Sequence, residues 1–182
     1  MEGLPAVSGT ARLFLAVWPG PAARGATLAL RDSWHWNATA RLMRPDQLHL
    51  SLHFIGAVPR GRLPALIDGL RVPFTPFDVV LDRPGQWAHG IAVLQPGVLP
   101  SGLLQLHASL QQALQQLGLP VETRAYKPHV TLARRAESAS PPETITPLRW
   151  RARSYALAES VAGPPRRYRV LQRYGPESRA AS

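Results

Sequence analysis

Two short segments of the chain repeat one order of residue types, and each pairs an imidazole with a hydroxyl. The first is HLSL, which begins at His49, and the second is HVTL, which begins at His129. Because successive side chains of a β-strand point to opposite faces, His49 shares a face with Ser51, and His129 shares one with Thr131. The aliphatic residues between them point the other way. Each segment therefore predicts a strand that offers an imidazole and a hydroxyl to one side and anchors itself in the core with the other.

Two imidazoles that face each other across a phosphate can act as a general base and a general acid. The neighbouring hydroxyls and a nearby arginine can hold the phosphoryl oxygens. One such tetrapeptide would carry little weight, since a lone histidine on a strand is usually structural. Its repetition in each half of the chain predicts a duplicated unit with pseudo-two-fold symmetry, whose polar faces meet at a cleft.

The surrounding sequence predicts the elements that position these residues. The expected strands cover residues 12–18, 47–56, 77–81, 86–94, 126–134, 149–157 and 167–172, and the expected helices cover 21–31, 63–70 and 101–117. The last helix carries a leucine stripe, with Ser101 as its expected N-cap and Gly118 as its C-terminal glycine. This interleaving predicts an α+β, bilobal, duplicated fold with two mainly antiparallel sheets facing a central cleft and helices on the outer faces. We expect a leader over residues 1–10, one domain over 11–175 and a flexible tail over 176–182.

The composition excludes several classes of protein. The chain has 182 residues, enough for one domain with its own core. It contains no Cys, which excludes disulfides, thiolate metal sites and cysteine catalysis. No apolar run approaches the roughly 20 residues that span a bilayer, and no signal peptide is recognisable. Metal-ligand spacings and Gly-rich phosphate loops are also missing. We therefore expect a soluble, cytoplasmic monomer with no cofactor, no metal and no membrane partner.

The net charge of +10 indicates a polyanionic partner such as nucleic acid. All but one of its 21 Lys and Arg residues are Arg, the exception being Lys127. Guanidinium groups grip phosphate in a bidentate manner, although codon bias would also produce this ratio. The arginines of the closing strands form either a basic rim for RNA or a solvated strand face. They are Arg149, Arg151, Arg153, Arg166, Arg167, Arg169 and Arg173.

Nearly the whole chain, from about Arg12 to Tyr174, resembles the two-histidine (2H) phosphoesterases. Within that group it is similar to the RNA 2',3'-cyclic phosphodiesterases, also called 2'-5' RNA ligases. RLFLAVWP resembles the first strand of the family, PDQLH resembles the lead-in to its first motif, and PHVTLAR is nearly identical to its second motif. The closing strands match as well.

The resemblance implies that His49 is the proton donor and His129 the proton acceptor. It also implies that Ser51 and Thr131 bind the phosphate and that Arg134 contacts the substrate. The implied reaction opens 2',3'-cyclic phosphate ends of RNA, tRNA fragments among them, to 2'-phosphomonoesters, with ligation as the reverse. Ser51 departs from the usual Thr of the family and lacks the methyl group that restricts χ1.

Two other readings stay open. The same site could act on another cyclic phosphate or on a 2'-5' oligonucleotide, or the cleft could bind RNA ends without turnover.

Three more residues are candidates either for substrate contact or for a structural role. His53 either lines the substrate channel or lies exposed at its rim, while Trp34 and Trp36 either stack a nucleobase or plug their loop onto the sheet. Phe54 is expected to face the core, and His107 to be structural.

Overall fold

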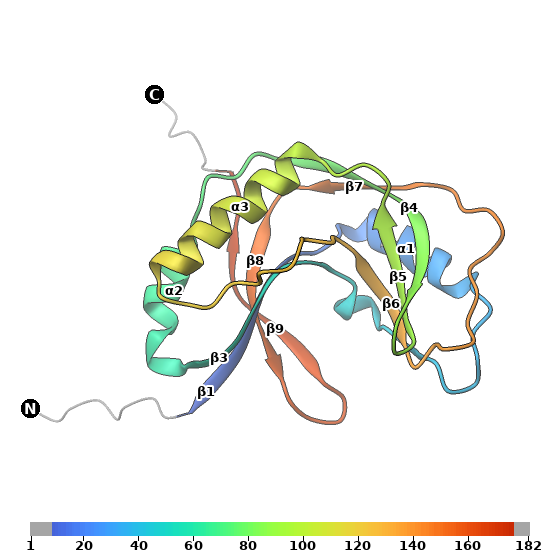
Figure 1. Ribbon diagram of the computed structural model, residues 1–182, viewed down its shortest axis with the longest axis horizontal. Coiled ribbons are helices and arrows are strands. Elements are labelled where there is room, and N and C mark those ends of the chain that lie inside the picture. Colours follow the sequence, from blue (N-terminus) through green and yellow to red (C-terminus); the bar gives the residue numbers. More distant parts are fainter. Residues whose placement is uncertain (1–8, 177–182) are drawn as a thin grey trace, which may run out of the picture.

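The computed structural model of the protein describes residues 9–176, and its elements are named as in Figure 1. The strands are β1 (Thr10–Val17), β2 (Arg41–Leu42), β3 (Leu50–Pro59), β4 (Phe77–Trp87), β5 (Ile91–Pro96), β6 (Val130–Arg134), β7 (Leu148–Ala152), β8 (Tyr155–Val161) and β9 (Arg167–Tyr174). The helices are α1 (Pro21–Asp32), α2 (Leu63–Gly69) and α3 (Ser101–Gln116), with short 3-10 turns η1 (Pro45–Gln47) and η2 (Arg60–Arg62).

The strands form one curved, antiparallel sheet in the order β7-β4-β5-β6-β3-β1-β8-β9, and β2 pairs with β6. Its two halves are the sheets that the sequence predicts, and they are joined where β3 meets β6 through Leu50 and Val130. Away from this pair the two strands diverge (Figure 1). The predicted α+β class and the mainly antiparallel pairing are confirmed, with the refinement that the two sheets are continuous.

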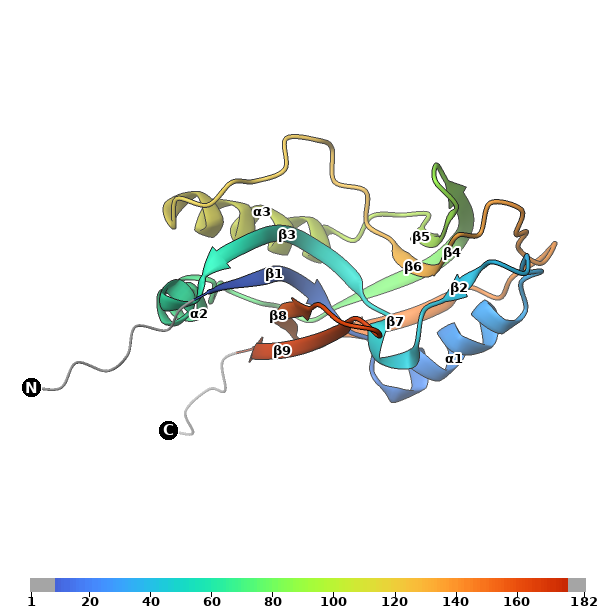
Figure 2. The same cartoon turned by 90° about the horizontal axis from the view of Figure 1, so that it is seen from below.

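Each half of the chain sends its helix onto the other half of the sheet. Helix α1 follows β1 but packs against β7, where Trp150 donates a hydrogen bond of 3.2 Å to the hydroxyl of Thr27. Helix α3 follows β5 but packs against β3 (Figures 1 and 2). It buries its leucine stripe. This exchange matches the duplication that the repeated motif predicts, and it ties both halves into one core.

Two predicted strands are wrong because each contains a turn. Residues 86–94 are the end of β4, a turn and β5, since His89 and Gly90 both have positive φ, 65° and 70°, as in a tight hairpin. Residues 149–157 are likewise split into β7 and β8 around Arg153 and Ser154. Trp87 and Ile91 flank the first turn, and Ala152 and Tyr155 flank the second, so the apolar residues on either side give no sign of a break.

The predicted ends of the elements need smaller corrections. Gly118 has a φ of 71° and follows α3 as expected, whereas the N-cap of α3 is Pro100, and Ser101 is already the first helical residue. Thr10 was expected in the leader but is the first residue of β1. Most of the predicted leader, residues 1–8, and most of the predicted tail, residues 177–182, lie outside the described residues.

Both motif strands contain a β-bulge directly after the hydroxyl residue. In β3, Ser51 pairs with Ala16 and His53 with Leu15, so that Leu52 has no partner of its own. In β6, the same shift lies at Leu132. A bulge adds one residue to a strand and resets its alternation. The duplication therefore extends to the irregularities of the two strands, and the residues after each bulge point elsewhere than strict alternation predicts.

Candidate active site

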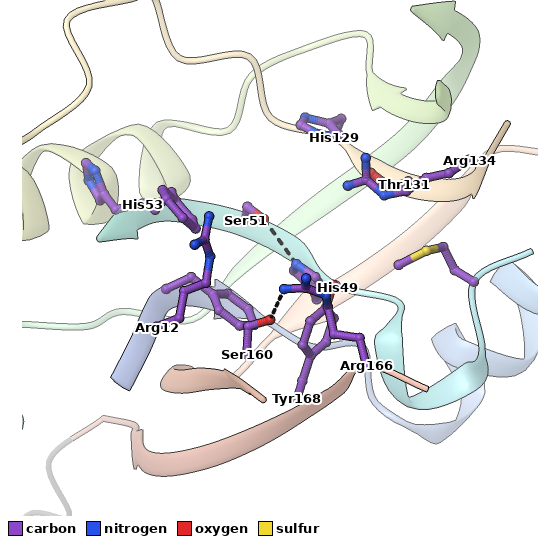
Figure 3. A pocket seen from close by; sticks show the side chains of 13 residues that line it. Arg12, His49, Ser51, His53, His129, Thr131, Arg134, Ser160, Arg166 and Tyr168 are labelled. Carbon is purple, nitrogen blue, oxygen red and sulfur yellow. Dashed lines mark hydrogen bonds between the residues drawn. The ribbon is translucent and has the colours of Figure 1, made fainter. Parts of the chain in front are cut away.

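A cavity of about 480 Å³ lies in the cleft between β3 and β6. The five residues that the sequence assigned to catalysis or phosphate binding all line it, as Figure 3 shows: His49, Ser51, His129, Thr131 and Arg134. The antiparallel pair Leu50–Val130 explains their arrangement. Extending this register by one residue in each direction sets His49 across from Thr131, and Ser51 across from His129. Two imidazoles and two hydroxyls thus share one face of two adjacent strands.

The two histidines are oriented by the same backbone contact. Nδ1 of His49 lies 2.7 Å from the carbonyl oxygen of Gln47, and Nδ1 of His129 lies 2.9 Å from that of Lys127. A carbonyl only accepts, so in each neutral ring Nδ1 carries the proton and Nε2 holds the free lone pair. Nε2 of His49 lies 3.1 Å from the hydroxyl of Ser51, which donates to it. Both rings are therefore preset to exchange protons through Nε2.

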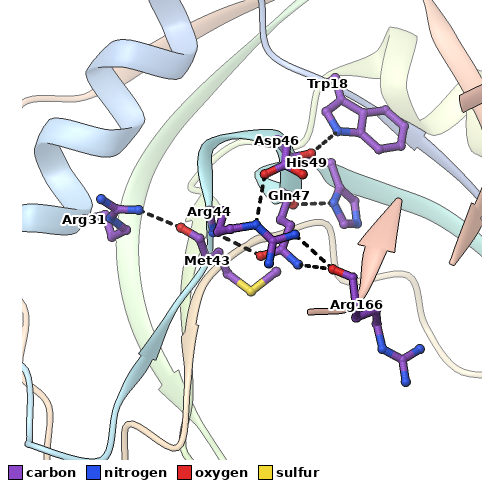
Figure 4. A network of polar contacts seen from close by, with 8 residues as sticks. All are labelled: Trp18, Arg31, Met43, Arg44, Asp46, Gln47, His49 and Arg166. Atoms are coloured by element: carbon purple, nitrogen blue, oxygen red, sulfur yellow. Dashed lines mark hydrogen bonds and ion pairs between the residues drawn. The ribbon is translucent and has the colours of Figure 1, made fainter. Parts of the chain in front are cut away.

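A network around η1 fixes the carbonyl that holds His49 (Figure 4). The side-chain amide oxygen of Gln47 accepts from the backbone N–H of Arg44 at 3.0 Å, and the guanidinium of Arg44 donates to the carbonyl of Arg166 at 2.9 Å. The indole of Trp18 donates to the carbonyl of Asp46 at 3.2 Å. The lead-in to the first motif is thus bonded both to the end of β1 and to the β8–β9 hairpin.

Three aromatic rings enclose His49. The ring centroids of Phe14, Trp18 and Tyr168 lie 5.2, 5.2 and 5.3 Å from that of the imidazole. Removal from water disfavours the charged ring and lowers the pKa of His49 to about 4, although the Gln47 carbonyl opposes the shift. His129 and Arg134 lower this pKa further by charge repulsion. These rings were missed in the sequence, although Phe14 and Trp18 alternate on one face of the first strand.

The surroundings of His129 are more open. The ring of Trp87 lies over it with a centroid distance of 4.3 Å and a tilt of 55°. Burial lowers the pKa of His129, the Lys127 carbonyl opposes this shift, and the charge of Arg134 adds to it. The sequence gives no signal for Trp87 as a site residue. It ends β4, and the turn at 88–90 that separates it from β5 is not apparent from the pattern of apolar residues.

The arginines of the predicted basic rim divide into separate groups. Arg166 lines the cavity with Arg12 and Arg134, and it donates to the hydroxyl of Ser160 at 2.9 Å. Arg169 is paired with the buried carboxylate of Glu159 at 2.5 Å. A second depression, next to the start of α1, is lined by Arg149, Arg151, Arg153 and Arg173 together with Arg24, whereas Arg167 is exposed and lines neither hollow. Arg149 and Arg151 are partly neutralised there by Asp78, at 3.4 and 3.5 Å.

The structure of β3 overturns the expectation for Phe54 and separates the two alternatives for His53. Phe54 was expected to face the core, but 53% of it is exposed, and it lines the cavity with the guanidinium of Arg12 5.2 Å from its ring centre. His53 is 4% exposed and so does not lie open at the rim. It borders the cavity while its ring stacks on His107. By the offset between the two motifs, Phe54 corresponds to Arg134, and both turn toward the cavity after a bulge.

Trp34 and Trp36 lie away from this cavity. Their rings stack on each other, 5.0 Å apart and 7° from parallel, and Trp34 is 4% exposed. Trp36 donates from its indole to the carbonyl of Arg31 at 2.9 Å. This placement agrees with the packing alternative for both residues and gives no support to base stacking. The aromatic side chains that do line the cavity are Phe14, Phe54 and Tyr168.

Over residues 9–176, no three His, Cys, Asp or Glu side chains are grouped so that they could hold a metal ion. Within the same residues, none of the helices has the length and apolar character needed to span a membrane.

Comparison with known proteins identifies similar chains over most of the sequence. The profile of the "2'-5' RNA ligase superfamily" matches residues 24–163. The RNA 2',3'-cyclic phosphodiesterase of Escherichia coli K12 is 33% identical over 159 residues, covering 77% of this chain and 85% of that protein. The protein of the same name from Thermus thermophilus is 29% identical over 176 residues, covering 90% and 89%. The crystal structure of E. coli LigT complexed with 3'-AMP superposes with a TM-score of 0.82, 28% identity and coverage of 93% and 99%.

Proposed function

Because this chain belongs to the 2'-5' RNA ligase superfamily, we propose that it is an RNA 2',3'-cyclic phosphodiesterase. It opens the cyclic phosphate at an RNA end and leaves a 2'-phosphomonoester. One observation carries the proposal: two imidazoles on adjacent strands, each anchored at Nδ1, line a single cavity and have no proton on Nε2. The names of the E. coli and Thermus relatives support the substrate class.

In the proposed reaction His129 is the base. Its lowered pKa keeps the ring neutral near pH 7, so that Nε2 can take a proton from a water molecule that attacks the phosphorus. The bond from phosphorus to O3' breaks as the new bond forms. His49, on the neighbouring strand, gives its proton to the departing O3'. Each histidine thereby handles one oxygen of an in-line displacement.

The low pKa of His49 has to be reconciled with its role as an acid. In the free protein a pKa of about 4 leaves the ring neutral at pH 7. A phosphate within the cavity places a negative charge beside the imidazole, which favours the protonated form and raises this pKa. The substrate thus helps to charge its own acid. Ser51, which donates to Nε2 in the free protein, is released by this protonation and can donate to a phosphoryl oxygen.

The remaining polar groups hold the phosphoryl oxygens. Thr131 provides a second hydroxyl, and Arg134 provides a guanidinium that can bind in a bidentate manner. Ligation uses the same groups in the same roles, with a 5'-hydroxyl in place of water at His129. The product is then a 2'-5' phosphodiester.

The test uses an RNA oligonucleotide that ends in a 2',3'-cyclic phosphate, with excess chelator present. We expect turnover to a 2'-phosphate end, and a fall in kcat/KM of roughly 10²- to 10⁴-fold in His49→Ala and in His129→Ala. His35→Ala is the matched control, since His35 is exposed and lies outside the cavity. Undiminished turnover in either cavity variant would overturn the mechanism. RNA binding without turnover in the wild type would indicate an RNA-end-binding protein instead.

A further inference from the structure

Beside the catalytic cavity lies a second, larger hollow of about 710 Å³. We propose that this groove binds the nucleoside that carries the 5'-hydroxyl, the strand that attacks in ligation and leaves when a 2'-5' bond is cleaved. The proposal rests on the proposed function, and it adds the place where the second strand is held. Volumes of 300–1,000 Å³ are usual for sites that bind small molecules.

The groove and the cavity are continuous. Both are lined by Ser51, His53, Phe54 and His129. His49, Thr131 and Arg134 line the cavity but not the groove. Of the two catalytic imidazoles only that of His129 borders the groove, so a ligand there meets the phosphate site beside His129.

The position of the groove beside His129 identifies the part of the substrate that it binds. In ligation the 5'-hydroxyl oxygen bonds to phosphorus, its proton passes to Nε2 of His129, the bond from phosphorus to O3' breaks, and O3' takes a proton from His49. In cleavage every transfer is reversed, and His129 returns its proton to O5'. In both directions the 5'-oxygen is the one that His129 serves. The nucleoside that carries this oxygen must therefore extend away from the phosphate on the His129 side, where the groove lies.

The lining of the groove suits a nucleoside. Trp87 and the exposed ring of Phe54 provide aromatic faces at the junction with the cavity. Deeper in the groove the rings of His53, His107 and Tyr126 form a continuous stack, with centroid distances of 4.0 and 3.9 Å. Nucleobases of single strands stack on such surfaces without regard to sequence. Arg124 and Lys127, both exposed on the segment before β6, add positive charge for the next phosphate of the strand.

Tyr126 also couples the groove to the phosphate site. Its hydroxyl donates to the backbone carbonyl of Ser51 at 2.7 Å, and burial raises its pKa, so that the hydroxyl keeps its proton. The wall of the groove is thus bonded to the strand that carries the phosphate-binding hydroxyl.

The experiment compares two substrates. A mononucleoside 2',3'-cyclic phosphate needs only the cavity, whereas cleavage of a 2'-5'-linked dinucleotide needs the groove as well. Ala125→Trp fills the groove from the segment before β6, and Ala88→Trp fills it from the β4–β5 turn, because both alanines are exposed and line it. Ala29→Trp, on the exposed face of α1, is the matched control.

We expect both groove variants to lower kcat/KM for the dinucleotide by roughly tenfold, the size of one lost base stack, and to change hydrolysis of the cyclic mononucleotide by less than about twofold. The control should leave both rates unchanged. Equal effects on the two substrates, or no effect on either, would overturn the groove assignment. The absence of any effect is the result expected if a protein segment docks in the groove. A wild type that hydrolyses the cyclic mononucleotide but never cleaves the dinucleotide would also refute it while the phosphodiesterase stands. Failure on both substrates would reject the proposed function itself.

Discussion

At the scale of single residues, the two imidazoles are anchored identically but surrounded differently. Each donates from Nδ1 to the carbonyl two residues earlier, which turns a property of the repeated motif into a fixed tautomer. Three aromatic rings surround His49, whereas Trp87 is the ring beside His129. The identical anchoring of the two histidines could be predicted from the sequence, because both copies of the motif share it. The difference in their surroundings could not be predicted, because the rings come from β1, β4 and β9.

The lowered pKa values of both histidines predict an acid-shifted pH profile. Catalysis needs one ring neutral and the other protonated, so kcat/KM, which reports the free enzyme, is expected to be bell-shaped with an optimum below pH 6.5. The optimum of kcat is expected at higher pH, since the bound phosphate raises both pKa values in the complex. The measurement is the rate on a cyclic mononucleotide from pH 4 to 9, with circular dichroism at each pH to confirm folding. An optimum of kcat/KM above pH 7 would contradict the assignment of these groups.

At the scale of elements, the sequence predicts most strands and helices but not where alternation is broken. The motif strands follow period two as far as Ser51 and Thr131, and those residues were placed correctly. Beyond each bulge the period restarts, so Phe54 turns outward where the core was expected. A bulge is set by the register with neighbouring strands, which no local pattern of apolar residues records. The turn at 88–90 was missed for a related reason, because its flanking residues are apolar on both sides.

The ring stack between α3 and β3 gives a second expectation, this time for stability. Burial, and then the charge of His53, lower the pKa of His107 to about 4 from an unfolded value of 6.5. Between these pH values the unfolded chain binds more protons than the folded one, so the free energy of unfolding decreases as the pH falls. His107→Phe keeps an aromatic ring in the stack and removes this titration. When the pH falls from 6.5 to 5, we expect the free energy of unfolding of the variant to decrease by about 1–2 kcal/mol less than that of the wild type.

Urea unfolding at both pH values measures the difference directly. His35→Phe is the control, because that ring is exposed and lies outside the stack. If wild type and His107→Phe lost the same stability on acidification, the stack would not be the source of the acid sensitivity.

At the scale of the whole molecule, the arrangement of charge predicts a path for the proposed RNA substrate. The groove lies on the His129 side of the cavity, and the arginine depression beside α1 lies on the His49 side. Trp18 connects the depression to His49, because it lines the depression and its ring packs against the imidazole of His49. An RNA whose cyclic phosphate sits in the cavity therefore has a basic surface close at hand for its preceding phosphates. The net charge alone could not have located this surface, because it depends on α1 crossing to β7.

This placement favours a basic rim over a merely solvated strand face, and the salt dependence of KM tests the two alternatives. For an oligonucleotide of about ten residues, Arg24→Ala and Arg173→Ala are each expected to reduce the slope of log KM against log salt by about 0.7–1, the share of one phosphate contact. For a cyclic mononucleotide, which reaches only the cavity, neither variant should change the slope. Arg83→Ala, at an exposed position of β4 outside the depression, is the matched control. The slope depends on the number of counterions released, and therefore on the number of phosphates that are bound. Equal slopes in all variants would show that these arginines are only solvated and that the RNA leaves the cavity by another route.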